Sequence, residues 1–343
     1  MERYKLSIVG AGPAGIAAVG KVLDTGVNPK EIHWIDPEFR VGDFGTKWGE
    51  VSSNTKIHRF EAFLRGSKSF DYDNMRSRFE LGKFDPEDTC TLKYVTEPLQ
   101  HITDNLRSMV DSTAGSVSKI APADGNWSVS FNCSSVLAER VILAVGSDPK
   151  VLDHSKPVIN LSDALDRSKL AVKVDSSDVV AVFGSSHSAI MASQNFLEVG
   201  VKKVINFYNK PLRYAVDNGD WILYDNTGLK GEAAEWARKN INIPNDRLFR
   251  TTSDQSSVER FLPECSKVVY AVGFEARAVP VEGMNPTKYD EKTGVIAPHL
   301  FGFGFAFPEK VVDRVGNIEY NVGLLKFIRR LDSVFPIWMN GSQ

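Results

Sequence analysis

The sequence contains few cysteines and no long apolar run. Its 343 residues include only Cys90, Cys133 and Cys265, which lie far apart and form no C-x-x-C pair. Widely spaced cysteines are typical of a reducing compartment and argue against a fold held together by disulfides. No apolar run approaches the roughly 20 residues of a membrane span, and the first residues show no signal core followed by a cleavage site. These absences predict a cytoplasmic protein with no membrane partner.

Net charge is also nearly absent. The 41 Lys and Arg residues and the 43 Asp and Glu residues give a formal net charge of −2, and no long basic block occurs. Such a chain lacks the positive surface that nucleic acids require, so we expect a small-molecule substrate and no nucleic-acid partner. With 42% hydrophobic and 24% charged residues, the chain is long enough for two globular domains. No metal site is expected, and assembly as a homodimer is left open.

Two glycine-rich turns are present. In the first, Gly10, Gly12 and Gly15 complete G-x-G-x-x-G between a strand-like run and a helix-like run that begins with Pro13 and Ala14. The first glycine allows the tight turn, the second lets the backbone approach a diphosphate, and the third lets the helix pack on the strand. Free N–H groups at the helix start attract phosphates. The turn therefore predicts a dinucleotide site, with glycines that serve packing alone as the alternative.

The strand-like run that follows supports this prediction. It ends at Asp36, about 20 residues beyond the turn, where a carboxylate can hold a ribose hydroxyl.

The second turn is less regular. It reads Gly184-Ser185-Ser186-His187-Ser188 and again joins an apolar strand to a helix. The next strand ends without an acid and is followed by Lys210 and Arg213, and basic residues at that place accommodate the 2′-phosphate of NADP. We therefore expect NADP here, with a solvated loop as the alternative. His187 could contact the nicotinamide phosphate or donate a proton, but a residue that opens a helix is expected to turn its side chain to solvent.

Two further segments repeat. RVILAVG ends at Gly146 and KVVYAVG ends at Gly273, each downstream of one glycine turn. With the two turns, they resemble the FAD-dependent pyridine-nucleotide oxidoreductases with two dinucleotide-binding domains, which include thioredoxin-reductase-like enzymes and flavin monooxygenases. The resemblance implies FAD at the first turn and NAD(P)H at the second. Val145 and Val272 stand where that family has threonine.

The resemblance also implies contacts with the flavin. Residues 36–55 are similar to the family's loop from the ribose-binding acid to the flavin ring, with matching positions at Pro37, Gly42, Gly45, Trp48, Asn54 and Thr55. The family's later Gly-Asp pair is missing, because Gly302 and Gly304 are each followed by phenylalanine. The last helix, whose Arg329 and Arg330 are expected to face away from the core, would present N–H groups of Asn321 and Val322 to the flavin ring. An ordinary docking helix is the alternative.

Three other segments have structural predictions. Residues 56–94 are rich in Phe and Arg and could line a substrate pocket or act as a packing cap. An amphipathic helix follows, with Leu99, Ile102, Leu106, Met109 and Val110 on one face. A hairpin is expected to turn at Asp124-Gly125.

These features together predict an α/β protein with two Rossmann-like domains of parallel sheets and helices, the first of them with helices on both faces of its sheet. Residues 1–152 and 284–343 would form a discontinuous FAD domain, and residues 153–283 an inserted NAD(P) domain.

We expect an FAD-containing oxidoreductase that takes hydride from NADPH to flavin N5 and passes electrons to an unidentified small acceptor. The alternatives are a flavin-dependent monooxygenase that uses a C4a-hydroperoxyflavin and a non-catalytic FAD/NAD(P)-binding protein. A disulfide reductase would need a redox-active pair of cysteines, and the three widely spaced cysteines form no C-x-x-C pair. The missing F-x-G-x-x-x-H signature and the short chain argue against the monooxygenase. The sequence identifies no catalytic residue.

Overall fold

The computed structural model describes residues 1–241, 243 and 245–340 and divides into two compact units. Unit 1 contains Met1–Gly49, Lys56–Ser147 and the chain from Ala276 onward, and unit 2 contains Glu50–Thr55 and Asp148–Glu275. One unit is thus inserted into the sequence of the other. The breaks lie after Ser147 and Glu275, whereas the sequence predicted them after 152 and 283, and the domain limits stay a prediction. No helix in the described part of the chain is long and apolar enough to span a membrane.

The central sheet of unit 1 is mainly parallel. Within the described residues its main path runs β17-β18-β8-β1-β2-β5. The bounds are β1 (Arg3–Val9), β2 (Ile32–Asp36), β5 (Asp111–Ala114), β8 (Ser134–Leu143), β17 (Val295–Ala297) and β18 (Leu300–Gly302). Val9 pairs with Ile35 and with Leu143 in parallel register, so β1, β2 and β8 end at the same edge. The first glycine turn therefore lies at the carboxyl edge of the sheet, where α/β folds bind ligands.

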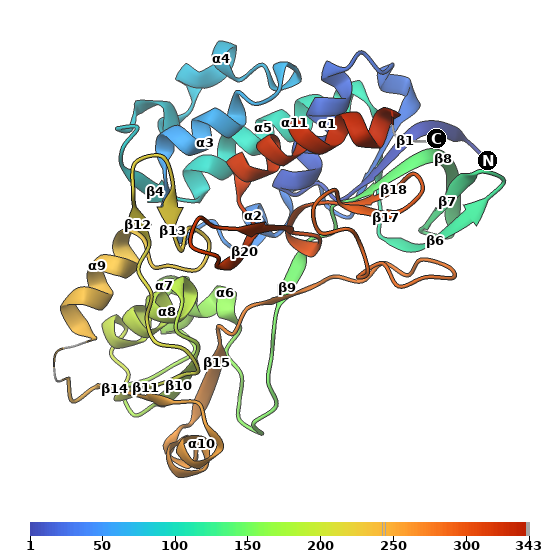
Figure 1. The fold of residues 1–343 in the computed structure, drawn as a ribbon. Helices are drawn as coiled ribbons and strands as arrows, with labels where there is room; N and C mark the ends of the chain where they lie inside the picture. Colours follow the sequence, from blue (N-terminus) through green and yellow to red (C-terminus); the bar gives the residue numbers. More distant parts are fainter. Residues whose placement is uncertain (242, 244, 341–343) are drawn as a thin grey trace. The chain divides into compact units, whose positions relative to one another are not determined.

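Helices cover one face of this sheet. The core there joins Ile8 and Trp34 to α1 (Pro13–Asp24), α3 (Ile57–Leu64), α5 (Lys93–Met109) and α11 (Leu324–Asn340), which gather together in Figure 1. The other face packs on β6 (Val117–Ala123) and β7 (Asn126–Phe131), which form a meander with β8. The expectation of helices on both faces is therefore wrong for unit 1. The alternating apolar residues of β7, Trp127, Val129 and Phe131, provide the cover instead.

The predicted hairpin is confirmed. Asp124 and Gly125 connect β6 to β7 with φ angles of 46° and 76°, the left-handed pair that a tight two-residue turn requires.

Residues 56–94 fold as short helices over the helical face. They form α3, η2 (Lys68–Phe70), α4 (Tyr72–Met75), η3 (Arg76–Arg78), η4 (Glu80–Lys83) and β4 (Thr89–Thr91). Their large apolar side chains are buried in the core of unit 1: Phe60, Phe63, Phe70, Tyr72, Met75, Phe79 and Leu81. Burial of these rings favours the packing cap over the substrate pocket, because a ring in the core is not available to a ligand.

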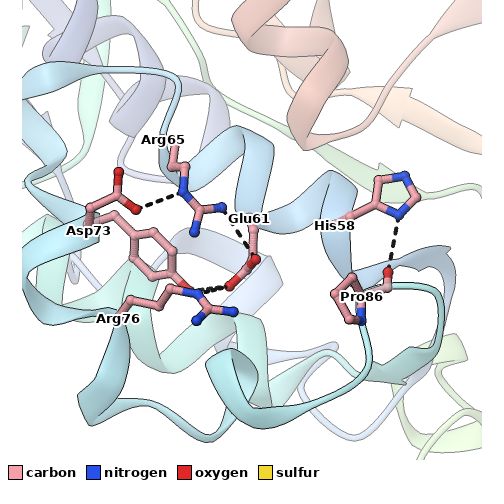
Figure 2. A network of polar contacts seen from close by, with 7 residues as sticks. His58, Glu61, Arg65, Asp73, Arg76 and Pro86 are labelled. Atoms are coloured by element: carbon pink, nitrogen blue, oxygen red, sulfur yellow. Dashed lines mark hydrogen bonds and ion pairs between the residues drawn. The ribbon is translucent and has the colours of Figure 1, made fainter.

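A buried carboxylate holds this cap together (Figure 2). Glu61 of α3 is 6% exposed and accepts hydrogen bonds from Arg76 Nε at 2.5 Å and from Arg65 Nη1 at 3.3 Å. The hydroxyl of Tyr72 donates to it at 3.4 Å, and Arg65 also pairs with Asp73. Two cations and a hydroxyl compensate the burial of this charge.

Two helix-face expectations need correction. Met109, at the end of α5, is 46% exposed, because the core contact passes to Val110 just beyond the helix. Arg330 is 4% exposed and its Nη1 donates to the carbonyl of Phe307, because segment 300–307 covers the side of α11 that the sequence left to solvent.

Unit 2 has a four-stranded parallel sheet in the order β14-β11-β10-β15. The strands are β10 (Val179–Phe183), β11 (Lys203–Tyr208), β14 (Leu248–Thr252) and β15 (Lys267–Tyr270). Helix α8 (His187–Glu198) packs on β10 and β11, and the stacked rings of Phe183 and Phe207 lie in a core with Leu262 of η5 (Leu262–Glu264).

The remaining elements are short. They are η1 (Pro29–Glu31), α2 (Gly42–Thr46), β3 (Ser52–Lys56), β9 (Ser147–Pro149), α6 (Leu161–Ala164), α7 (Arg167–Ala171), β12 (Val216–Asp217), β13 (Ile222–Leu223), α9 (Gly231–Asn240), α10 (Gln255–Phe261), β16 (Phe274–Ala276), η6 (Gly304–Ala306), β19 (Glu309–Val312) and β20 (Ile318–Asn321).

Candidate nucleotide-binding sites

The three glycines of the first turn have different surroundings. Gly10 has a φ of +106°, and a Cβ there would lie 2.3 Å from the carbonyl oxygen of Ala144. A Cβ on Gly15 would lie 1.9 Å from the carbonyl oxygen of Gly10. Gly12 has a φ of −74°, and its Cβ would meet nothing closer than an oxygen of Val41 at 4.0 Å. Packing therefore requires the outer two glycines, whereas the space beside Gly12 is open to a ligand.

Helix α1 begins at this open space. Its N-cap is Gly12, which supplies no side-chain acceptor, Pro13 occupies its first turn, and that turn contains no acidic residue. The N–H groups and the positive end of the helix dipole are left for an anion. Ala14 lies at the same place, and a Cβ added to Gly304 would lie 2.6 Å from the Cβ of Ala14. The sequence did not identify this contact, since Gly304 and Ala14 are almost 300 residues apart.

Asp36 connects the turn to the loop after β2. Its Oδ2 accepts the N–H of Ala11 at 2.7 Å, and its Oδ1 accepts those of Glu38 and Phe39 at 2.9 and 2.7 Å. A carboxylate offers about four acceptor positions. Oδ2 therefore retains a position for one more donor such as a ribose hydroxyl, and the carboxylate also shapes the protein around the site.

The loop from Asp36 to Trp48 has an unusual backbone. Phe39, Val41 and Gly42 all have left-handed φ angles, of 53°, 59° and 56°. Such angles are costly for a β-branched residue such as valine. A Cβ on Gly42 would lie 3.0 Å from Cα of Gly12, and one on Gly45 would lie 2.3 Å from an oxygen of Arg40. Gly42 thus lets the loop approach the glycine turn, and Gly45 lets the loop fold back on its own backbone.

The other predicted flavin contacts are more scattered. Pro37 is exposed and Trp48 half-buried, and Asn54 and Thr55 fall in the segment that groups with unit 2. Gly146 has a φ of +75° and accepts the N–H of Arg277 at 3.0 Å. Asn321 ends β20, and Val322 lies two residues before α11. Both are half-buried, and the Asn321 amide donates to Glu309 at 2.8 Å.

The second turn repeats the construction of the first. Gly184 has a φ of +132°, its N–H donates to the carbonyl of Phe207 at 2.8 Å, and its Cβ would lie 2.3 Å from an oxygen of Ala271. In unit 1 the N–H of Gly10 donates to Ile35 in the same way, at 2.7 Å. Ser185, Ser186 and Ser188 surround the start of α8, whose first turn contains no acidic residue. Ser186 is its N-cap and makes no side-chain capping bond.

His187 corrects one expectation. Its side chain is not turned to solvent, because Nδ1 is buried without a hydrogen-bond partner among the described residues and the ring bonds the backbone of Ser52. Burial lowers the pKa of His187, so the imidazole is neutral near pH 7.

The predicted basic residues lie at the surface. Lys210 and Arg213 are both exposed, and the guanidinium of Arg213 lies 4.9 Å from the ring centre of Tyr224. Gly273, which follows β15, has a φ of +104°. In the part of the chain that the structure describes, no group of three or more His, Cys, Asp or Glu is placed to hold a metal ion.

Comparisons with known proteins agree with this architecture. Residues 7–148 match a family described as FAD-NAD(P)-binding. The chain is 32% identical to "Monooxygenase AgnR1" of Paecilomyces divaricatus over 97% of each sequence. It resembles the ornithine N-hydroxylase of Kutzneria sp. 744 with a TM-score of 0.68 at 14% identity, covering 99% of this chain and 100% of the other. It resembles thioredoxin reductase of Lactococcus lactis with a TM-score of 0.61 at 11% identity, covering 98% and 99%. At such identities the two structures indicate the fold alone.

Proposed function

Because the chain belongs to the family of FAD- and NAD(P)-binding flavoproteins that includes the Paecilomyces divaricatus monooxygenase, we propose that it is an NADPH-dependent flavin monooxygenase acting on a small molecule. Membership of this family indicates an FAD-dependent NAD(P)H oxidoreductase. The more specific proposal of a monooxygenase rests on the Paecilomyces divaricatus relative, which is similar over nearly its whole length. It also removes the objection that the chain is too short for a monooxygenase, since the two sequences cover each other to 97%.

The residues of unit 1 fit FAD. The open space beside Gly12 and the uncapped start of α1 suit a diphosphate. The remaining acceptor position of Asp36 suits a ribose hydroxyl. Loop 37–48 and the start of α11 would hold the flavin ring, with Gly42, Gly45, Trp48, Asn321 and Val322 as the proposed contacts. In the same scheme Gly146 would contribute a backbone contact, and Asn54 and Thr55 stay predictions from the sequence.

Unit 2 fits a second dinucleotide. Gly184, the three serines and the start of α8 would hold the diphosphate of NADPH. The neutral imidazole of His187 adds a polar group at this turn without adding charge. Lys210 and Arg213 supply positive charge after β11.

Bound FAD supplies the chemistry, since its ring accepts hydride from a nicotinamide and can then react with dioxygen. The protein binds and orients both cofactors. A disulfide-reductase activity has little support, because burial raises the pKa of Cys90 and of Cys265 to about 11 and leaves both thiols protonated.

The proposal is tested by anaerobic titration of the FAD-loaded protein with NADPH and then NADH, followed by mixing with oxygen. We expect stoichiometric bleaching of the flavin band, faster with NADPH. The oxidised spectrum should then return in two kinetic phases, because the bound flavin of a monooxygenase reacts with oxygen in one step and returns to its oxidised form in a second, slower step. Return in a single slow phase would favour a reductase with another small acceptor. Failure of both nucleotides to bleach the band would favour the non-catalytic binding protein.

A further inference from the structure

The two glycine turns show which residue of unit 2 replaces the ribose-binding acid of unit 1. In unit 1, Trp34 Nε1 donates to the carbonyl of Gly10 at 2.9 Å, and Asp36 follows two residues later. In unit 2, Asn206 Nδ2 donates to the carbonyl of Gly184 at 2.8 Å. Asn206 therefore corresponds to Trp34, and Tyr208 stands at the place of Asp36. An aromatic ring occupies the position where an acid would favour a free 2′-hydroxyl.

A guanidinium lies against this ring. Arg250 of β14 is paired in register with Asn206 of β11, and its Nε donates to Asn206 Oδ1 at 2.7 Å. Its Cζ lies 4.6 Å from the ring centre of Tyr208. The Asn206 amide is itself fixed, because Nδ2 donates to the carbonyls of both Val182 and Gly184. Arg250 is thus oriented by the same side chain that holds the glycine turn.

Arg250 forms no ion pair with an acid in the part of the chain that the structure describes. Among the described residues Nη2 is buried and has no hydrogen-bond partner. Asp254, four residues after Arg250, instead caps α10 through the N–H of Ser257 and accepts hydroxyls of Thr252 and Ser256. A half-buried guanidinium that is oriented in this way, with no acid partner among the described residues, is suited to a phosphate dianion.

We propose that Arg250, stacked on Tyr208 and held by Asn206, binds the 2′-phosphate of NADPH and determines the preference for NADPH over NADH. This inference rests on the proposed use of NADPH. It replaces Lys210 and Arg213 as the principal phosphate contacts. Those two side chains are exposed, and an exposed flexible cation gives a weaker and less directional contact than a guanidinium fixed at two sides.

The test measures ligand binding rather than turnover. Calorimetric titrations with 2′,5′-ADP, 5′-AMP and ADP compare the wild type with R250M and R250K. Loss of a hydrogen bond to a charged group corresponds to about a 10- to 100-fold change in Kd. R250M should weaken 2′,5′-ADP by that factor and leave 5′-AMP and ADP unchanged. R250K keeps the positive charge but loses the paired N–H donors of the guanidinium, so it should weaken 2′,5′-ADP binding by a smaller factor. If R250M does not fold, R250K tests the proposal instead.

R260M is the matched control. Arg260 of α10 is exposed and also lies over an aromatic ring, 4.9 Å from the centre of Phe261. Its replacement should leave binding of 2′,5′-ADP unchanged. In anaerobic reduction, R250M should lose the preference for NADPH over NADH.

Three results would overturn the inference, and they are distinguishable. If folded R250M binds 2′,5′-ADP like the wild type while K210A/R213A loses it, Arg250 is not the contact, and the use of NADPH stands. If R250M weakens 5′-AMP and ADP as strongly as 2′,5′-ADP, Arg250 serves the common part of the nucleotide. If the wild type binds 2′,5′-ADP no better than 5′-AMP, the NADPH proposal fails together with this inference.

Discussion

Single glycines of the first turn have separable physical roles. Gly10 and Gly15 are required because the Cβ of any other residue would overlap backbone oxygens at 2.3 and 1.9 Å. Gly12 borders open space and has a φ that any residue adopts. Folding and cofactor binding can therefore be affected independently.

We predict that Gly12→Ala folds but does not bind FAD. Replacing a glycine N-cap by alanine should cost the apoprotein no more than about 1 kcal/mol, whereas the added methyl group occupies the space that a diphosphate needs. Flavin retention after desalting and chemical denaturation of the apoprotein measure the two effects.

Gly15→Ala is the contrasting variant. Its methyl group cannot fit without a backbone shift, so the apoprotein itself should lose about 3 kcal/mol or more. Tight FAD binding by Gly12→Ala would contradict the placement of the diphosphate.

His33 predicts an acid-sensitive stability. The ring is 2% exposed, stacks on Tyr4 with centroids 4.7 Å apart, and has Nε2 3.0 Å from the hydroxyl of Thr113. Burial lowers the pKa of His33 from 6.5 to about 4. Between these values the unfolded chain binds the proton and the folded chain does not, so stability falls as pH falls from about 6.5 to 4, by about 3 kcal/mol in total.

Urea denaturation at several pH values measures this effect. His33→Gln should show a weaker decline than the wild type across that window, whatever its stability at pH 7. Parallel pH profiles for the two proteins would rule out His33 as the cause.

At the scale of elements, the cap formed by residues 56–94 depends on Glu61 of α3. We predict that Glu61→Gln lowers the free energy of unfolding by about 1–3 kcal/mol, because Arg65 and Arg76 lose their shared anion. Urea denaturation gives this value. Glu87→Gln is the control, because the Lys56–Glu87 pair is exposed and should leave stability unchanged.

The same variant separates the two interpretations of the cap. Reduction by NADPH and oxidation of a substrate should proceed normally in Glu61→Gln once temperature is kept below its unfolding transition. A loss of substrate oxidation without loss of stability would restore the substrate-pocket alternative.

At the scale of the molecule, each unit should respond to its own ligand. We predict that FAD slows amide hydrogen exchange in residues 10–15 and 36–45, and that 2′,5′-ADP slows it in residues 184–190 and 206–208. A ligand present at 100 times its Kd reduces the population of the locally open state, and with it the exchange rate, by about 100-fold. Protection of the second turn by FAD would contradict the assignment, and Gly12→Ala should lose only the FAD effect.

The sequence by itself determined the local backbone. The glycine turns, the apolar strands that precede them, the Asp124-Gly125 hairpin and the amphipathic helix α5 are all encoded by local sequence, where steric limits on φ and apolar periodicity decide the conformation. From those turns and the repeated AVG segments the two-domain α/β fold could be predicted.

Only the tertiary structure decided which distant side chains meet. Arg250 and Asn206 are 44 residues apart and are brought together by the register of β11 and β14. Gly304 reaches Ala14, and Arg330 is buried, because segment 300–307 packs on helices that no local pattern identifies as its partners. Strand register and interhelical packing are set by the sum of many distant contacts, so the proposed nucleotide contacts that depend on them are absent from any short stretch of sequence.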